Sequence, residues 1–126
     1  MSETHKRAWF FYVDDMITFA EKTLAYTDSY TQEEFVASGL TYDATLRNLE
    51  LIGEAATHIP DEVRAAHPEI MWRMIVAMRN RLIHGYLGVD NSTIWSVIQD
   101  DIPALLKSLQ ELKSNELLTD IVLMNK

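Results

Sequence analysis

The apolar residues of this chain recur every three or four positions along segments that contain few helix breakers. Phe10, Val13, Ile17, Ala20 and Leu24 follow one another at this spacing, which places them on one face of an α-helix. Only four Gly and three Pro occur in 126 residues, and no segment alternates apolar and polar residues as a half-buried strand does. The sequence therefore predicts an all-α fold, an antiparallel helical bundle of about five helices.

Local signals set the expected boundaries of these helices. Thr31 and Glu34 match a capping box that begins a short helix, and Asp90 or Asn91 fits the N-cap of the last long helix. Pro103 lies inside that last helix, where its missing N–H should produce a kink. Long helices are expected at residues 6–26, 41–58, 69–85 and 92–113, with a single turn at 61–66 and a separate short helix at 116–124.

The inward faces of these helices supply the expected core. Trp9, Trp72 and Trp95 lie on the apolar stripes, where core packing is a more common role than stacking on a nucleic-acid base. The other expected core residues are Leu46, Leu49, Ile52, Ala56, Ile75, Val76, Met78, Leu82, Ile94, Ile98, Ile102, Leu105, Leu109 and Leu112. A chain of 126 residues can bury such a core without disulfides or metals.

Composition narrows the possible chemistry and location. The chain has no Cys, which excludes disulfides, thiolate nucleophiles and Cys-ligated zinc. Because no apolar stretch is long enough to span a bilayer and the N-terminus lacks a secretory signal, we expect a soluble cytoplasmic protein without a membrane partner. The net charge of -8 disfavours extended wrapping of nucleic acid, since phosphate contacts require clustered Lys and Arg.

Residues 70–89 depart from this acidic background. They contain Arg73, Arg79 and Arg81 and no acid, so the segment carries +3 and the other 106 residues together carry -11. Arginine presents a planar fork of donors that matches the oxygens of a phosphate. The segment is therefore the candidate for local contact with a phosphate group.

Three polar side chains in this segment suit one kind of chemistry. The guanidinium of Arg79, the carboxamide of Asn80 and the imidazole of His84 lie within six residues, beside Gly85. An imidazole can move a proton near neutral pH, and a guanidinium can stabilise charge on phosphorus. The set suits attack on a phosphodiester without a metal or another cofactor. The helix dipole alone also favours such cations near a helix C-terminus, so the spacing by itself is a weak motif.

Helix geometry limits how these side chains meet. At about 100° per residue, Asn80 and His84 lie roughly 40° apart, whereas Arg79 and His84 lie roughly 140° apart. One chain can aim both at a single point if the Arg79 side chain wraps around the helix, or if the helix loosens before His84. Alternatively, a second copy of the chain completes the site.

The motif also resembles that of a known family. Arg79-Asn80-x3-His84-x-Tyr86 resembles the RX4HXY motif of HepT-like proteins, a branch of the HEPN ribonuclease superfamily. The segment RNLELIGEAA at residues 47–56 resembles the RNLExIGEA block of the same proteins, and Ile102-Pro103 resembles part of their downstream helix. The resemblance runs from the first helix to about Lys113. One domain is expected over residues 1–126, in which residues 113–126 form a C-terminal extension without a recognisable feature.

The resemblance implies an activity and two partners. HepT-like proteins are all-α and usually homodimeric, with two motifs facing a shared cleft, and they act as metal-independent RNases. Each is the toxin of a pair whose antitoxin, an MNT-type nucleotidyltransferase, silences it by transferring AMP to the motif tyrosine. The chain is thus expected to be a homodimeric toxin that cleaves RNA. The alternative is a non-enzymatic helper that binds a nucleotide or substrate for the nucleotidyltransferase.

The same resemblance implies a role for each motif residue. Arg79 would hold and polarise the scissile phosphate, and His84 would be the general base or acid while the RNA 2′-hydroxyl attacks, which yields a 2′,3′-cyclic phosphate. Asn80 would orient the phosphate or the imidazole, and Tyr86 would accept AMP. Arg81 is an additional cation that fits either RNA or an adenylylated tyrosine.

Glu54 and Gly53 lie earlier in the sequence than the motif segment, and each has alternative interpretations. Glu54 shares a helix face with Arg47 and Glu50. It would orient Arg79 or His84 across a helix pair in a functional role, but a structural ion-pair ladder along its own helix is the favoured interpretation. Gly53 costs roughly 1 kcal/mol relative to Ala in mid-helix, so we expect it to permit close approach of another helix or of a second copy.

The remaining candidate site residues are better explained by ordinary structural roles. Adjacent helical residues diverge by about 100°, so the pairs Asp14-Asp15 and Asp100-Asp101 are expected on solvated faces and no metal site is expected. Three histidines without metal-ligand spacing are expected at the surface: His5, His58 and His67. The apolar residues 121–124 would either cover a partner or pack the C-terminus.

Overall fold

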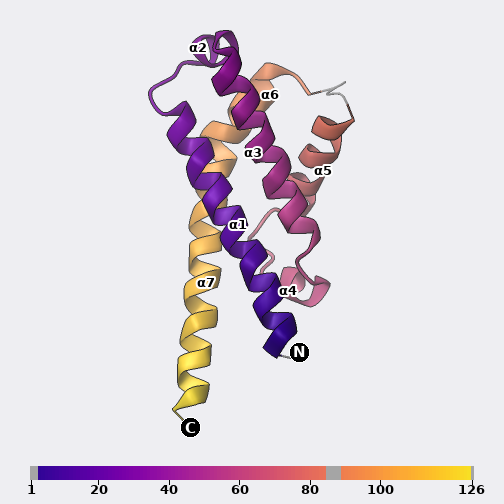
Figure 1. Cartoon of the computed structure of the whole chain (residues 1–126), viewed down its shortest axis with the longest axis vertical. Helices are drawn as coiled ribbons and strands as arrows, with labels where there is room; N and C mark the ends of the chain where they lie inside the picture. The colour runs from indigo at the N-terminus through magenta and orange to yellow at the C-terminus, as the bar shows by residue number, and fades with distance from the viewer. Residues whose placement is uncertain (1–2, 85–88, 126) are drawn as a thin grey trace.

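The chain folds as an antiparallel helical bundle, which confirms the predicted all-α fold (Figure 1). The computed structural model describes the backbone of residues 3–84 and 89–125, and the side chains of residues 8–84 and 89–125. Within these ranges every regular element is a helix. The four longest helices form the bundle and run alternately up and down: α1 (Glu3–Thr27), α3 (Gly39–Thr57), α5 (Trp72–Ile83) and α7 (Ile102–Met124).

Three short helices connect the long ones: α2 (Gln32–Ala37), α4 (Asp61–Ala66) and α6 (Asn91–Ser96). The predicted capping box of α2 is confirmed, because the Thr31 hydroxyl accepts from the Glu34 N–H at 3.1 Å and the Glu34 carboxylate accepts from the Thr31 N–H at 2.9 Å. Asp90 caps α6 by accepting from the Thr93 N–H at 2.7 Å. Both caps satisfy backbone donors that a helix start leaves unpaired.

Several predicted boundaries differ from those observed, and α1 begins at Glu3 rather than at residue 6. α5 begins at Trp72 rather than at residue 69, with Met71 at its N-cap, and the Trp72 indole N–H donates to the His67 carbonyl at 3.1 Å. This bond anchors the preceding loop to the first turn of α5. The separate helix expected at 116–124 does not form, because α7 continues to Met124 through a segment without Gly or Pro.

A π-helical turn, η1 (Val97–Asp101), precedes Pro103 and separates α6 from α7. The Ile102 N–H donates to the Val97 carbonyl, five residues earlier. Pro103 has no N–H, so the carbonyl four residues before it lacks its usual helical donor, and a wider turn accommodates that loss. Where a kink was predicted, the chain therefore passes from α6 into α7 through a π turn that ends just before Pro103.

One cluster of buried side chains joins the helices. The predicted core of residues 94–112 is confirmed, and Trp9 and Trp72 are buried while Trp95 packs at the core edge. Along α1 the most buried line keeps Val13 and Ala20 of the predicted stripe. Its other members are Trp9, Met16, Thr23 and Thr27. α1 packs against both α3 and α7, so the predicted residues Phe10, Ile17 and Leu24 border this line instead of forming its centre.

Among the described residues, four polar side chains are buried, and two of them are satisfied by their own helix. The hydroxyls of Thr23 and Thr27 donate to carbonyls four residues earlier, each at 2.8 Å. In α3, by contrast, the Thr45 hydroxyl and the Asn48 amide nitrogen are buried without a hydrogen-bond partner among the described residues. A buried polar group that is left without a partner costs free energy.

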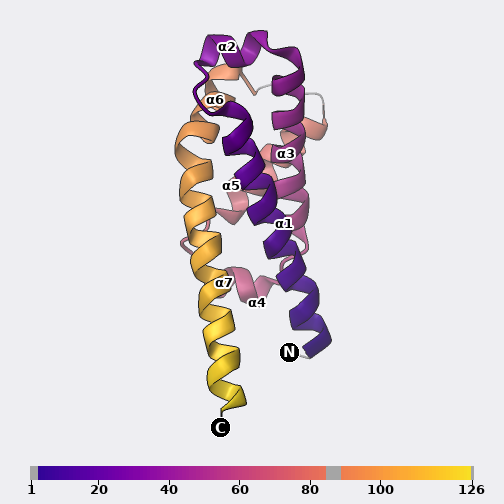
Figure 2. The same ribbon diagram turned by 60° about the vertical axis from the view of Figure 1, so that its left-hand side comes forward.

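The last turns of α7 extend beyond the other helices, at the end of the bundle where α1 begins (Figure 2). Their apolar side chains are exposed: Leu117, Leu118, Ile121, Val122, Leu123 and Met124. These residues therefore do not pack against the chain's own core. Among the described helices, none has the combination of length and apolarity needed to cross a bilayer.

Candidate functional site

α5 and the residue after it carry the polar side chains of the motif. Arg73, Asn80 and Arg81 are exposed on α5, and the side chain of Arg79 is 27% exposed. His84 follows the last helical residue as the C-cap of α5 and is exposed. Because the four arginine and asparagine positions belong to α5, the packing of this helix on the bundle sets where their side chains start.

Gly53 sets the distance between α3 and α5. A methyl group at this position would overlap the Cβ of Arg79 and lie 2.9 Å from its Cγ and 3.0 Å from the Ile75 carbonyl oxygen. Only a residue without a side chain fits such a contact. The predicted close helix approach is therefore confirmed, and the helix that approaches is α5 of the same chain.

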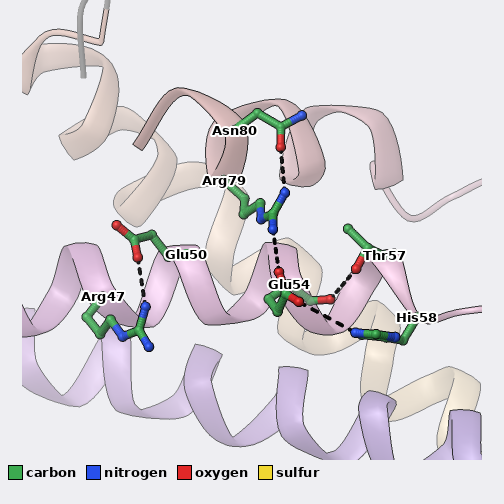
Figure 3. Close-up of polar contacts among 7 residues, drawn as sticks. All are labelled: Arg47, Glu50, Glu54, Thr57, His58, Arg79 and Asn80. Atoms are coloured by element: carbon green, nitrogen blue, oxygen red, sulfur yellow. Dashed lines mark hydrogen bonds and ion pairs between the residues drawn. The ribbon is translucent and has the colours of Figure 1, made fainter. Parts of the chain in front are cut away.

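This close approach brings a carboxylate of α3 onto the arginine of α5 (Figure 3). Glu54 Oε2 accepts from Arg79 Nη2 at 2.6 Å, and Arg79 Nη1 donates to Asn80 Oδ1 at 2.8 Å. The guanidinium is held at two nitrogens by groups from two helices. Because a guanidinium has five N–H donors, donors remain for a ligand such as a phosphate.

The predicted ion-pair ladder on α3 forms only in part. Arg47 and Glu50 pair at 2.9 Å, as expected for residues three apart on a helix. Glu54 does not continue this ladder toward Arg47. Its carboxylate lies between Arg79 of α5 and His58 at the end of α3, whose Nε2 is 3.5 Å from Oε1 (Figure 3).

Within one chain, Arg79 and His84 are not joined. α5 stays helical up to Ile83, and the His84 N–H still donates to the Asn80 carbonyl at 3.2 Å, so the helix does not loosen before His84. The Arg79 side chain turns toward Glu54 on α3, and no hydrogen bond or ion pair links it to His84 among the described residues. Asn80 lies between the two residues, because it contacts Arg79 and precedes His84 by one helical turn.

The other predicted site residues have different surroundings. Tyr86 lies outside the described residues, as does Gly85. Arg81 lines a groove of about 530 Å³ between α5 and the α6–η1 segment, together with Asp90 and Asp101. Burial raises the pKa of the Asp101 carboxyl, and the negative charge of Asp100 raises it further.

His58 and Tyr12 were missed as neighbours of the site. Sequence reasoning placed His58 at the surface, and its side chain is indeed 47% exposed. However, its ring stacks on Tyr12 of α1, with centroids 4.5 Å apart and planes at 14°, and it contacts Glu54. The signal available in the sequence was the spacing of four residues between Glu54 and His58, which places both on one helix face.

The remaining titratable candidates fall outside this site. His67 is less exposed than predicted, at 16%, and its ring lies 3.4 Å from Glu69 and 3.8 Å from Glu116. Asp14 pairs with Lys113 of α7 at 2.6 Å, whereas the side chain of His5 lies outside those described. Among the described residues, no three His, Asp or Glu side chains converge as ligands of a metal ion would.

Comparison with known proteins identifies the family. Residues 16–112 match the family model described as "Ribonuclease HepT-like". A "Probable ribonuclease HepT" of Thermococcus cleftensis is 37% identical over 113 residues, which make up 90% of this chain and 99% of that protein. "Putative RNase TTE0752" of Caldanaerobacter subterraneus subsp. tengcongensis is 34% identical, covering 83% of this chain and 94% of its own length.

A third relative, "Putative RNase MJ1380" of Methanocaldococcus jannaschii, is 31% identical over 76% of this chain and 88% of its own length. No solved structure matches the chain significantly. The matched range includes Glu54, Arg79, Asn80 and His84. On the family model and these relatives, the chain belongs to the HepT-like ribonuclease family.

Proposed function

We propose that this chain is a metal-independent endoribonuclease and the toxin of a toxin–antitoxin pair. The observation that carries the proposal is the arginine held by Glu54 and Asn80, one turn from an exposed histidine, in a chain of the HepT-like ribonuclease family. The proposal treats residues 1–126 as one cytoplasmic domain, in which residues 113–126 extend beyond the matched range.

The proposed reaction is cleavage of RNA by its own 2′-hydroxyl. The 2′-oxygen forms a bond to phosphorus while the bond from phosphorus to the 5′-oxygen breaks, which leaves a 2′,3′-cyclic phosphate and a 5′-hydroxyl. One group removes the proton of the 2′-hydroxyl and another protonates the leaving oxygen, and His84 performs one of these steps. Arg79 stabilises the charge that develops on the phosphate oxygens, and Asn80 orients its guanidinium.

We further propose that the active form is a homodimer whose two motifs face one cleft. Its support is geometric, because the Arg79 side chain is turned toward Glu54 of α3 and no described contact joins it to the exposed His84. A second copy can supply the histidine for the arginine of the first. In such a dimer each active site contains Arg79 from one protomer and His84 from its partner.

The proposed regulator is an MNT-type nucleotidyltransferase that transfers AMP to Tyr86. This group would add bulk and negative charge two residues from His84. It would block RNA sterically and by repulsion of the phosphate backbone. Arg81, exposed on the same stretch, would pair with RNA in the free toxin and with the AMP phosphate in the silenced one.

RNA cleavage by the purified chain and by single variants tests the catalytic assignment. Arg79→Ala and His84→Ala should each lower kcat/KM by about 10²- to 10⁴-fold, with cleavage by the unmodified chain persisting in excess EDTA. Arg73→Ala is the matched control, because it removes an exposed arginine from the same helix. Unchanged cleavage by Arg79→Ala would refute the assignment. No cleavage by the unmodified chain, at any RNA tested, would favour the alternative role as a nucleotide-binding helper.

Mixing the two inactive variants tests the shared cleft. After subunit exchange, about half of the dimers contain one chain of each kind, and each such dimer has one intact composite site. The mixture should then recover about one quarter of the unmodified activity. If each site lies within one chain, mixing recovers nothing.

Co-expression with an adjacent nucleotidyltransferase tests the regulator. The intact mass of the chain should increase by whole AMP units, and cleavage should fall accordingly. The Tyr86→Phe variant should show no mass increase and should remain active. Modification of that variant at the same level would place the acceptor elsewhere.

A further inference from the structure

The Glu54 carboxylate has a separate partner for each of its oxygens (Figure 3). Oε2 lies 2.6 Å from Nη2 of Arg79 on α5, and Oε1 lies 3.5 Å from Nε2 of His58 at the C-cap of α3. The Glu54 side chain itself is 47% exposed. An exposed glutamate with one partner can exchange rotamers readily, whereas two partners on opposite sides define the plane of the carboxylate.

The His58 ring is itself held from a third helix. It stacks on the ring of Tyr12 of α1, with a centroid separation of 4.5 Å and an interplanar angle of 14°. Tyr12 is partly buried against the core, so it offers a fixed surface to the imidazole. Side chains of α1, α3 and α5 therefore meet in one sequence of contacts, from Tyr12 through His58 and Glu54 to Arg79.

We infer that His58, supported by Tyr12, is a positioning residue for the arginine of the active site and acts through Glu54. The inference rests on the proposed function, since it assigns His58 to the same RNase site. His58 does not touch the substrate in this account. It fixes the orientation in which Glu54 holds the Arg79 guanidinium, and thereby the direction of the donors left for the scissile phosphate.

The exposure of His58 and Glu54 distinguishes a positioning role of His58 from a purely structural one. Both His58 and Glu54 are about half exposed, and ion pairs of such residues contribute little to folding stability. Loss of the contact should therefore change catalysis more than stability. The effect should appear mainly in kcat, because Arg79 acts on charge that develops in the transition state.

Two substitutions of His58 isolate its contact with Glu54. His58→Phe keeps a ring for the stack on Tyr12 but has no N–H, whereas His58→Gln keeps an N–H donor near the position of Nε2. We expect His58→Phe to lower kcat for RNA cleavage about fivefold at an unchanged melting temperature. His58→Gln should stay within about twofold of the unmodified chain. Equal kcat for His58→Phe and the unmodified chain, or equal losses in both variants, would overturn the inference.

A double-mutant cycle with Glu54→Gln tests whether the effect passes through Glu54. In the Glu54→Gln background, His58→Phe should cause no further loss, because the ion pair that His58 supports is already gone. Fully additive losses would mean that His58 acts by another route. Arg79→Ala, measured in parallel, distinguishes failure of the proposed function from failure of the inference about His58. If it cleaves RNA normally, the proposed function fails, and if it is inactive while the cycle is additive, only the inference about His58 fails.

Discussion

The close contact between Gly53 and Arg79 makes Gly53→Ala the most informative single substitution in the bundle. Two opposing effects act on stability. Ala in mid-helix gains about 1 kcal/mol over Gly, but the added methyl overlaps the Arg79 Cβ and lies 3.0 Å from a backbone oxygen of α5. Neither atom can rotate away as the tip of a long side chain can, so α5 must shift as a whole. Overpacking of this kind costs about 1–3 kcal/mol.

The net change in the free energy of unfolding should therefore be a loss of about 2 kcal/mol or less, while the catalytic effect should be large. Restoring an ordinary van der Waals separation requires α5 to move by on the order of 1 Å, and a displacement of that size in a catalytic group costs about 10²-fold in rate. Arg79 sits at the point of overlap. We thus expect kcat/KM for RNA cleavage to fall about 100-fold in a folded protein.

Urea unfolding and an RNA-cleavage assay on the same preparation measure both quantities. Gly39→Ala is the matched control, because Gly39 is the first residue of α3 and a methyl there meets no atom within 4 Å. The control should keep full activity. A Gly53→Ala variant that is more stable than the unmodified chain and cleaves RNA at the same rate would refute the argument that Gly53 sets the position of Arg79.

Three further predictions concern the rest of the bundle. Thr45→Val replaces a buried hydroxyl without a described partner by a methyl group, and should raise the free energy of unfolding in urea by about 1 kcal/mol; a decrease would reveal a missing partner. The hydrogen bond from the Thr93 N–H, followed by that from its side chain, lowers the pKa of Asp90. The contribution of the Asp90 carboxylate to stability is therefore present above its unfolded pKa of about 3.9. This contribution is lost as the pH falls through its folded pKa. Asp90→Ala should thus lower the free energy of unfolding at pH 7. In urea unfolding at a pH below the folded pKa of Asp90, the variant and the unmodified chain should be equally stable; an undiminished difference there would contradict the cap. Removal of residues 117–126 should cost about 2 kcal/mol or less, because the apolar side chains of 117–124 are exposed; calorimetric evidence of a larger loss would show that they pack on the bundle.

Local properties of the sequence predicted much of the fold. The spacing of apolar residues over 94–112 indicated which side chains would be buried. Six of the seven named there are buried, and Trp95 is partly buried. The Thr31 capping box depends on residues three apart, so it was visible without any tertiary information. The continuous α7 was missed although the absence of Gly and Pro after Lys113 is visible in the sequence. The burial of Met16 and Thr23 on α1 was not predicted, because it depends on which neighbouring helices cover α1.

The sequence by itself determined that the chain is a helical bundle and that Arg79, Asn80 and His84 are its candidate catalytic groups. Periodicity, caps and motif spacing are properties of neighbouring residues, and the resemblance to HepT-like proteins rests on the same residues. Only the tertiary structure decided that Glu54 meets Arg79, and that His58 shares this carboxylate. The physical reason is the antiparallel packing of α3 on α5 at Gly53, which brings side chains 25 residues apart in sequence to within hydrogen-bonding distance.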